Sequence, residues 1–376
     1  MRVLGALVMG ASRKIMLAVA GVCLMSAGLM SATPVQAKEY LLTGAKPDKL
    51  FLIDAKARKV AREYKIPDNS ISPMTMVISP DQKTVYVVTN HNKAITGINL
   101  ESGMEVFRAE LSRASDERAI NYALEVSADG KELFSYELIT KLLPDRYQVE
   151  DPRISIYRTD AGLSAKADHT FADVPRRIHM LLAKKDGSKL YALGWDFYTL
   201  DPKTGKIIDT FPLRHWKRPN STQPDLLNFW PMQDQTGVFM SLINWGRTDL
   251  PPTDPKSAVT GLLTIDLKSG KFDVSPFDVD PQVLFTATLS PNRKEAFAVY
   301  THLLKIDLVS HKVVARIPLD HSYYVVQPSG DGSEVYLGGT LCDIPVYSTR
   351  DLKKLGAITL PGCPSMAGSP LKVVHW

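Results

Sequence analysis

The residues of this chain best suited to chemistry lie in two short stretches. In 320-DHSYYVVQPSGDG-332, a histidine and two tyrosines precede an alternating strand pattern. The stretch 223-QPDLLNFW-230 combines a carboxylate, an amide and two large rings. Aromatic rings with a polar tip suit a pocket wall or the grip on a partner chain. We therefore expect a substrate-pocket or partner-facing role for His321, Tyr323, Tyr324, Asp225, Asn228, Phe229 and Trp230.

Motifs for self-sufficient catalysis are missing from the sequence. It contains no C-x-x-C-H for covalent haem, no P-loop, no G-x-G-x-x-G and no G-x-S-x-G elbow. Its eight histidines are scattered without metal-ligand spacing. We therefore expect no metal site, no covalently bound cofactor and no catalytic residue in this chain.

A repeat sets the architecture that must position these residues. An Asp or Asn recurs with an aromatic residue five positions later, as in Asp81/Tyr86, Asp129/Phe134, Asp186/Tyr191, Asp234/Phe239, Asn292/Phe297 and Asp331/Tyr336. A second strand follows and often ends in Ile-Asp, as in LFLID, LLTID and LLKID. Units of four short strands at roughly 40 to 58 residues are typical of a propeller.

The unit count predicts an all-β, seven-bladed β-propeller formed by residues 38–376 as a single domain. Six units begin with an inner strand, at 74-MTMVIS, 122-YALEVS, 177-RIHMLLA, 228-NFWPMQD, 285-FTATLS and 323-YYVVQPS. The first unit lacks one, and the chain ends with a spare apolar segment, 365-SMAGSPLKVVHW-376. Pairing of this C-terminal strand with the N-terminal blade would close the ring and remove exposed edges.

Propeller topology sorts the loops onto two faces. The tight turns join the first strand of each blade to the second and the third to the fourth, and they lie on one face. The long insertions all fall on the other, at 137–152, 214–228 and 245–260. Long irregular loops commonly carry binding sites, so the second face is the expected working face. The 320–324 cluster enters its strand from that face, near the mouth of the central channel.

Packing is the competing interpretation for the candidate residues. One of the two tyrosines would then lie between blades while the other faces the channel, and Trp230 would be buried, as most indoles are. Trp195, Trp216 and Trp245 stand in or beside loops of the long-loop side. If their indoles are exposed, they indicate a docking surface.

Two cysteines, Cys342 and Cys363, lie at the start of the third and after the fourth strand of the last blade. These strands are antiparallel neighbours, so the two residues should meet on one face. A disulfide there would staple the closing blade, and two free thiols are the alternative.

The N-terminus has the order of a cleaved export signal. Arg2, Arg13 and Lys14 precede an apolar run, and small residues at Val35 and Ala37 follow it. We expect cleavage after Ala37 and a periplasmic mature chain, with a retained membrane anchor as the alternative. Removing three basic residues lowers the formal net charge from +5 to +2, too little for nucleic-acid binding by bulk electrostatics.

Several strings together resemble one family. KEYLLTGAKPDKLFLID, RRIHMLLAKKDGSKLYALGWDFYTLDPKTGK, QPDLLNFW, TGLLTIDLKSG and PLDHSYYVVQPSGDGSEVYLGGTL are similar, in the same order, to the beta subunit of quinohemoprotein amine dehydrogenase. The resemblance spans essentially the whole mature chain and is specific at DHSYY and PDKL. The cysteine pair is not part of the pattern expected throughout that family.

The resemblance implies a periplasmic heterotrimer. In that family a dihaem cytochrome c alpha subunit transfers electrons, and a small gamma subunit holds cysteine tryptophylquinone. The propeller subunit cradles gamma and shapes the pocket for oxidative deamination of primary amines to aldehyde and ammonia. The isolated chain would not be catalytic, since the cofactors carry the chemistry.

Two alternatives stay open. One is a stand-alone periplasmic propeller of the YVTN type that binds a ligand or partner; the string VYVVTN at 85–90 is compatible with it. The other is the heavy chain of a methylamine-dehydrogenase-type enzyme.

Overall fold

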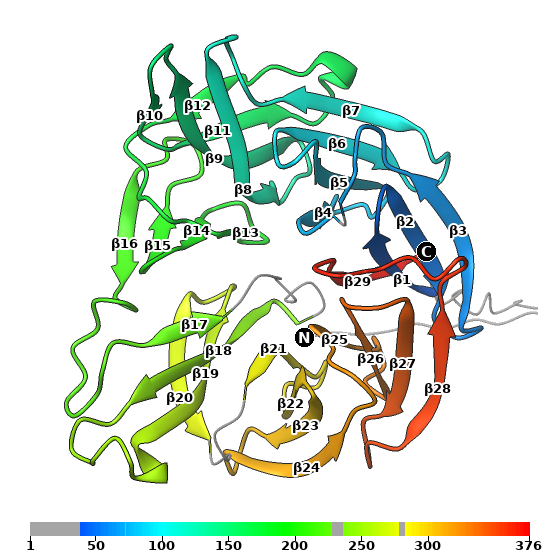
Figure 1. The fold of residues 1–376 in the computed structure, drawn as a ribbon, viewed down its shortest axis with the longest axis vertical. Helices are drawn as coiled ribbons and strands as arrows, with labels where there is room; N and C mark the ends of the chain where they lie inside the picture. The colour runs from blue at the N-terminus through cyan, green and yellow to red at the C-terminus, as the bar shows by residue number, and fades with distance from the viewer. Residues whose placement is uncertain (1–37, 72, 228–235, 278–282) are drawn as a thin grey trace, which may run out of the picture. The chain divides into compact units, whose positions relative to one another are not determined.

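The computed structural model describes residues 38–71, 73–227, 236–277 and 283–376. These residues form seven antiparallel sheets arranged around a central axis (Figure 1). The described part contains no α-helix, only the 3₁₀ turns η1 (Gly162–Ser164) and η2 (Pro255–Ser257). None of its helical segments is long and apolar enough to span a membrane. The predicted all-β, seven-bladed propeller is confirmed.

The strands follow one another blade by blade. The first blade joins both chain ends: β1 (Glu39–Ala45), β2 (Lys49–Asp54), β3 (Lys59–Lys65) and β29 (Leu371–His375). The second contains β4 (Met76–Ile78), β5 (Thr84–Thr89), β6 (Ala94–Asn99) and β7 (Glu105–Glu110). The third has a fifth strand: β8 (Glu117–Val126), β9 (Glu132–Leu142), β10 (Tyr147–Val149), β11 (Arg153–Arg158) and β12 (His169–Phe171).

The remaining four blades have four strands each. The fourth contains β13 (Met180–Ala183), β14 (Leu190–Leu193), β15 (Phe197–Leu200) and β16 (Ile207–Phe211), and the fifth β17 (Asp225–Leu227), β18 (Val238–Gly246), β19 (Ala258–Asp266) and β20 (Lys271–Phe277). The sixth contains β21 (Leu284–Leu289), β22 (Glu295–Tyr300), β23 (His302–Asp307) and β24 (Lys312–Pro318), and the seventh β25 (Val325–Pro328), β26 (Glu334–Gly338), β27 (Asp343–Ser348) and β28 (Lys354–Thr359).

The ring closes as the sequence predicts. The last strand, β29, pairs antiparallel with β1, with Tyr40 opposite Val374. Figure 1 shows this contact as red β29 beside blue β1. The C-terminal strand thus supplies the inner strand that the first unit lacks.

The recurring aromatic residue explains how the blades pack. Each of the six aromatic residues of the repeat lies on the second strand of its blade and is no more than 4% exposed. The tight turn before it is held by its own side chains. In four turns a serine two positions before the Asp or Asn donates to that side chain: Ser79 to Asp81, Ser127 to Asp129, Ser290 to Asn292 and Ser329 to Asp331. The turn residues therefore set the register that buries the ring.

One predicted strand falls outside the described residues, and two predicted loops are more regular than expected. The predicted inner strand at 228–234 lies outside the described residues, and β17 is found just before it, at Asp225–Leu227. The insertions at 137–152 and 245–260 are less irregular than expected. Strand β9 continues to Leu142 between β8 and β10, and β18 pairs with β19 as far as Gly246 opposite Ala258. Alternating apolar and polar residues there extend the ladder, so the insertions are hairpins.

Cys342 and Cys363 form a disulfide with a Cα–Cα distance of 4.8 Å. It joins the residue before β27 to the turn after β28, and so links neighbouring strand ends of the seventh blade. The cysteines are 21 residues apart. In the chain-entropy model, closing a loop of this length stabilises the fold by about 3 kcal/mol.

We expect the double variant C342A/C363A to lose about 3 kcal/mol of unfolding free energy, because its unfolded chain regains the loop entropy. Urea unfolding followed by tryptophan fluorescence measures this loss. A reducing agent should lower the midpoint of the wild type and leave that of the variant unchanged. Equal effects of the reductant on both proteins would contradict the assignment.

Candidate functional site: the long-loop face

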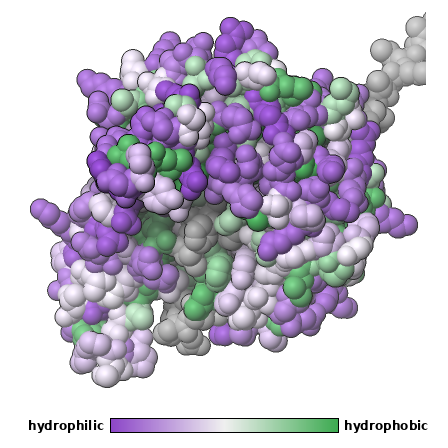
Figure 2. All heavy atoms as spheres, turned by 45° about the horizontal axis from the view of Figure 1, so that its top comes forward, coloured by the Kyte–Doolittle hydropathy of each residue, from purple (hydrophilic) through white to green (hydrophobic). Residues whose placement is uncertain are grey.

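We call the face that carries the connections from the second to the third strand, and from the fourth strand to the next blade, the long-loop face. All inner strands enter the ring from it. Within the described chain, residues at or beside the start of inner strands include Met74, His179, Asp225, Phe285, Tyr324 and Pro370. On the surface seen in Figure 2, hydrophilic side chains predominate, apolar patches are small and separate, and the molecule is hollowed near the centre.

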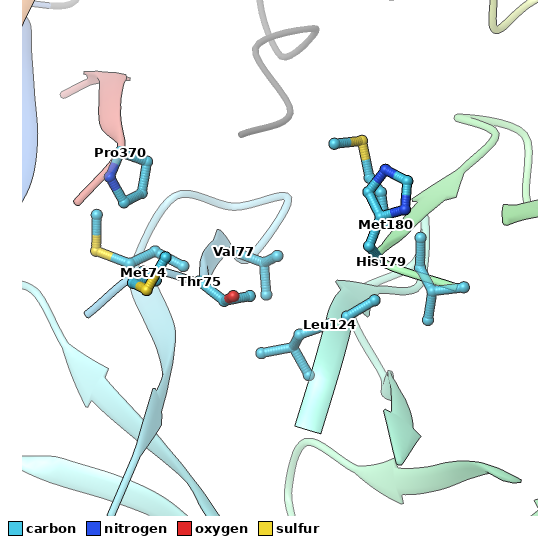
Figure 3. A pocket seen from close by; sticks show the side chains of 10 residues that line it. Met74, Thr75, Val77, Leu124, His179, Met180 and Pro370 are labelled. Atoms are coloured by element: carbon cyan, nitrogen blue, oxygen red, sulfur yellow. The ribbon is translucent and has the colours of Figure 1, made fainter. Parts of the chain in front are cut away.

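Inner-strand side chains of the second, third and fourth blades line one small cavity. A cavity of ≈ 20 Å³, about the space for one water molecule, lies between Met74, Val77, Leu124, His179 and Met180. Figure 3 shows Met74 beside Pro370 on one side and His179 with Met180 on the other. Burial lowers the pKa of His179, which favours the neutral imidazole. This cavity itself has little room for a ligand.

Three aromatic rings form a stack across the sixth and seventh blades. The ring of Phe285 on β21 lies 4.5 Å from that of Tyr324 and 4.6 Å from that of Tyr300, with interplanar angles of 9° and 27°. Thr286 donates a hydrogen bond of 2.7 Å to the carbonyl oxygen of Tyr324 and so fixes the backbone at the ring. Tyr324 and Phe285 are only half-buried. The stack thus forms a flat, largely apolar surface of half-buried rings.

The neighbouring cluster of His321, Tyr323 and Asp343 positions this wall. The Tyr323 hydroxyl donates to Asp343 Oδ2 at 2.6 Å, and His321 Nε2 lies 3.0 Å from Asp343 Oδ1. Burial, together with the Asp343 carboxylate, raises the pKa of Tyr323, so its hydroxyl stays a donor. The Tyr323 ring is 1% exposed and packs between the sixth and seventh blades. The Tyr323 ring is therefore enclosed between blades, as the packing interpretation places one of the two tyrosines. It acts by holding Asp343 and His321.

A larger pocket opens between the third, fourth and fifth blades. It has a volume of ≈ 500 Å³, and its lining includes Tyr122, Arg177, Trp195, Arg214 and Asp225. Trp195 is 41% exposed. The guanidinium carbons of Arg177 and Arg214 lie 4.7 and 5.6 Å from its ring centroid, within cation–π range. The structure thus brings Asp225 together with two arginines that the sequence analysis did not single out.

Some of the other predicted residues are buried, and others lie outside the described residues. Asn228, Phe229 and Trp230 lie outside the described residues. Trp245 is 9% exposed and packs edge-to-face on Trp216 at 5.5 Å. Among Trp195, Trp216 and Trp245, Trp195 is the residue whose side chain is exposed. Within the described chain, no group of three or more His, Cys, Asp or Glu side chains is placed to hold a metal ion.

A buried ion-pair network holds the base of the third-blade hairpin. Glu137 on β9 is fully buried; its Oε2 lies 2.7 Å from Nε of Arg153, and its Oε1 accepts a 3.0 Å bond from the Tyr157 hydroxyl. Arg153 also lies 2.9 Å from Glu117 on β8. Burial raises the pKa of Glu137 even with Arg153 beside it. The network joins β8, β9 and β11 where the hairpin leaves the four-stranded ladder.

Arg153→Met should destabilise the protein by about 3–5 kcal/mol, because it leaves the Glu137 charge buried without a partner. Chemical unfolding measures the loss. The matched control is Arg158→Met, at the other end of β11. It breaks an exposed ion pair with Asp160 and should change stability little. Adding Glu137→Gln to Arg153→Met should recover part of the loss; a double variant no more stable than the single would contradict this account.

Comparisons with known proteins identify the fold. No protein-family model and no curated protein sequence matches the chain. Hydrazine synthase of Kuenenia stuttgartiensis matches it in structure with 13% identity and a TM-score of 0.53, over 84% of this chain and 90% of that one. The periplasmic gluconolactonase PpgL of Pseudomonas aeruginosa matches with 14% identity and a TM-score of 0.53, over 89% and 99%. At such identities the likeness shows a shared seven-bladed propeller fold.

Proposed function

We propose that the chain is the beta subunit of a periplasmic quinohemoprotein amine dehydrogenase, and that it binds its partner chains through the long-loop face. The observation that carries the proposal is the stack of the half-buried rings of Phe285, Tyr300 and Tyr324 beside the inner strands of the sixth and seventh blades. The stack contains the DHSYY motif's second tyrosine, and that motif is among the most specific parts of the sequence resemblance.

The role of this chain is to shape a site whose cofactors belong to its partners. Cysteine tryptophylquinone of the gamma subunit and haem c of the alpha subunit would supply the oxidation of a primary amine to aldehyde and ammonia. A flat apolar wall fits one side of a pocket for a ring-shaped group and excludes water from it. The His321–Asp343–Tyr323 cluster holds the wall in place, and the hairpins of the third and fifth blades extend the contact surface.

Export to the periplasm is part of the proposal. The basic, apolar, small-residue order of the first 37 residues supports it. One structural neighbour is named as a periplasmic gluconolactonase, which agrees with use of this fold in that compartment.

A second candidate function is a stand-alone ligand-binding propeller. The pocket beside Trp195 favours it, because ≈ 500 Å³ is within the usual size range of small-molecule sites. A complex with haem-bearing partners separates the two candidates.

Tyr324→Ala should lower amine turnover of the complex purified from its native host by about tenfold, because it removes one ring of the wall and loosens the pocket. Steady-state kinetics with a primary amine and thermal unfolding are measured on the same preparation. The control, Tyr198→Ala, removes another half-buried tyrosine, on β15, and should cost stability without a matching loss of turnover. Equal losses of turnover and stability in Tyr324→Ala would show that Tyr324 serves only to pack the fold. If the tagged wild-type chain co-purifies with neither haem nor a small partner, the proposal fails.

A further inference from the structure

The lining of the pocket beside Trp195 has an excess of positively charged side chains. Three arginines line it, Arg176, Arg177 and Arg214, against one carboxylate, Asp225. Arg176 is already held by Asp151 at 3.0 Å and by the carbonyl oxygen of Glu150. Arg177 and Arg214 have no ion-pair partner among the described residues; each lies over the Trp195 ring instead. Two guanidinium groups at the rim are therefore free to bind an anion.

The backbone at Arg214 is held in position within the loop between the fourth and fifth blades. The backbone N–H of Arg214 donates to the carbonyl oxygen of Trp195 at 2.9 Å. On either side of it, the N–H of Leu213 and the ring of His215 bind the Asp196 carboxylate at 2.9 and 2.6 Å. Burial acts to raise the pKa of Asp196, but these hydrogen bonds outweigh it and the pKa lies below its ordinary value. The Asp196 carboxylate is thus ionised at neutral pH, and the backbone of Arg214 is fixed before any ligand binds.

The rest of the lining is apolar or aromatic. Ile178, Leu138, Leu213 and Leu226 contribute side chains to the wall, and Tyr122, at a bulge of β8, is 51% exposed. A guanidinium group binds a carboxylate through two parallel hydrogen bonds, which makes arginine specific for planar anions. An apolar body adjoining that anion would be buried against the wall.

From these features we propose that this pocket binds a small aromatic carboxylate, with the anion on Arg177 and Arg214 and the ring against the apolar wall. Its lining shares no residue with the Phe285–Tyr300–Tyr324 stack, and the arginines that would bind the carboxylate belong to this chain. It is therefore testable whether or not the proposed function holds.

The test uses phenylacetate as the probe and phenylacetamide as its uncharged counterpart. Calorimetric titration of the purified mature protein, in whatever assembly it is isolated, should show binding of phenylacetate and at least tenfold weaker binding of the amide, because the amide lacks the charge that the arginines bind. Arg214→Met and Arg177→Met should each weaken phenylacetate binding about tenfold. Trp195→Phe should abolish the change in tryptophan emission that accompanies binding.

The matched control is Arg218→Met. Arg218 also lies over indole rings, 5.1 Å from Trp216 and 5.5 Å from Trp245, but is absent from the lining of this pocket. Its replacement should leave phenylacetate affinity unchanged. Equal affinity for acid and amide, an equal loss in Arg218→Met, or no binding at about 10 mM probe would overturn the proposal.

Discussion

The pairing of β29 with β1 is the constraint on which the rest of the structure depends. Each blade buries its faces only against its neighbours, so an open array would expose two apolar sheets and an unpaired edge. Residues from the two ends of the chain, Tyr40 and Val374 among them, pair and complete one sheet. Closure of the ring sets the width of the central channel, and the arrangement of blades around the channel determines which loops lie next to one another at its mouth. The disulfide between Cys342 and Cys363 lies in the neighbouring blade, where it reinforces the same seam.

Closure also divides the molecule into one face that is determined by local sequence and one that is not. On the tight-turn face, Ser–Asp pairs such as Ser79 and Asp81 bind the turn and the strand after it. These contacts are local and recur from blade to blade. On the long-loop face the side chains differ in every blade, and their contacts join residues far apart in the chain. Phe285 meets Tyr324 there, and Trp195 meets Arg214. This asymmetry makes the long-loop face the surface on which function can vary while the ring stays the same.

The sequence is informative where the physics is local or periodic. The aromatic residue five positions after the Asp or Asn predicts the second strand of each blade, and the spare C-terminal strand predicts ring closure. Both are confirmed by the structure. The hairpins of the third and fifth blades were expected as irregular loops, because Pro and charged residues there obscure an alternating pattern. Only the ladder partners, such as Val259 opposite Trp245, decide that these segments are strands.

The candidate site could be predicted only in part. The DHSYY motif locates a cluster at the mouth, but its residue types cannot tell which tyrosine is enclosed. Burial of Tyr323 follows from the blade beside it and from the Asp343 carboxylate, 20 residues along the chain. The pocket at Trp195 was missed because Arg177, Trp195 and Arg214 come from three different connections. An exposed tryptophan flanked in space by arginines has no spacing signature in the sequence.

The central claim is that partner chains occupy the long-loop face of the ring. Cryo-electron microscopy of the assembly isolated with the tagged chain from its native host tests it most directly. The account predicts density for a small chain and a haem-bearing chain over the channel mouth, with the Tyr324 ring in the interface and the tight turns around Asp81 and Asp129 free. Partner density on the tight-turn face, or a ring isolated without any partner, would contradict it.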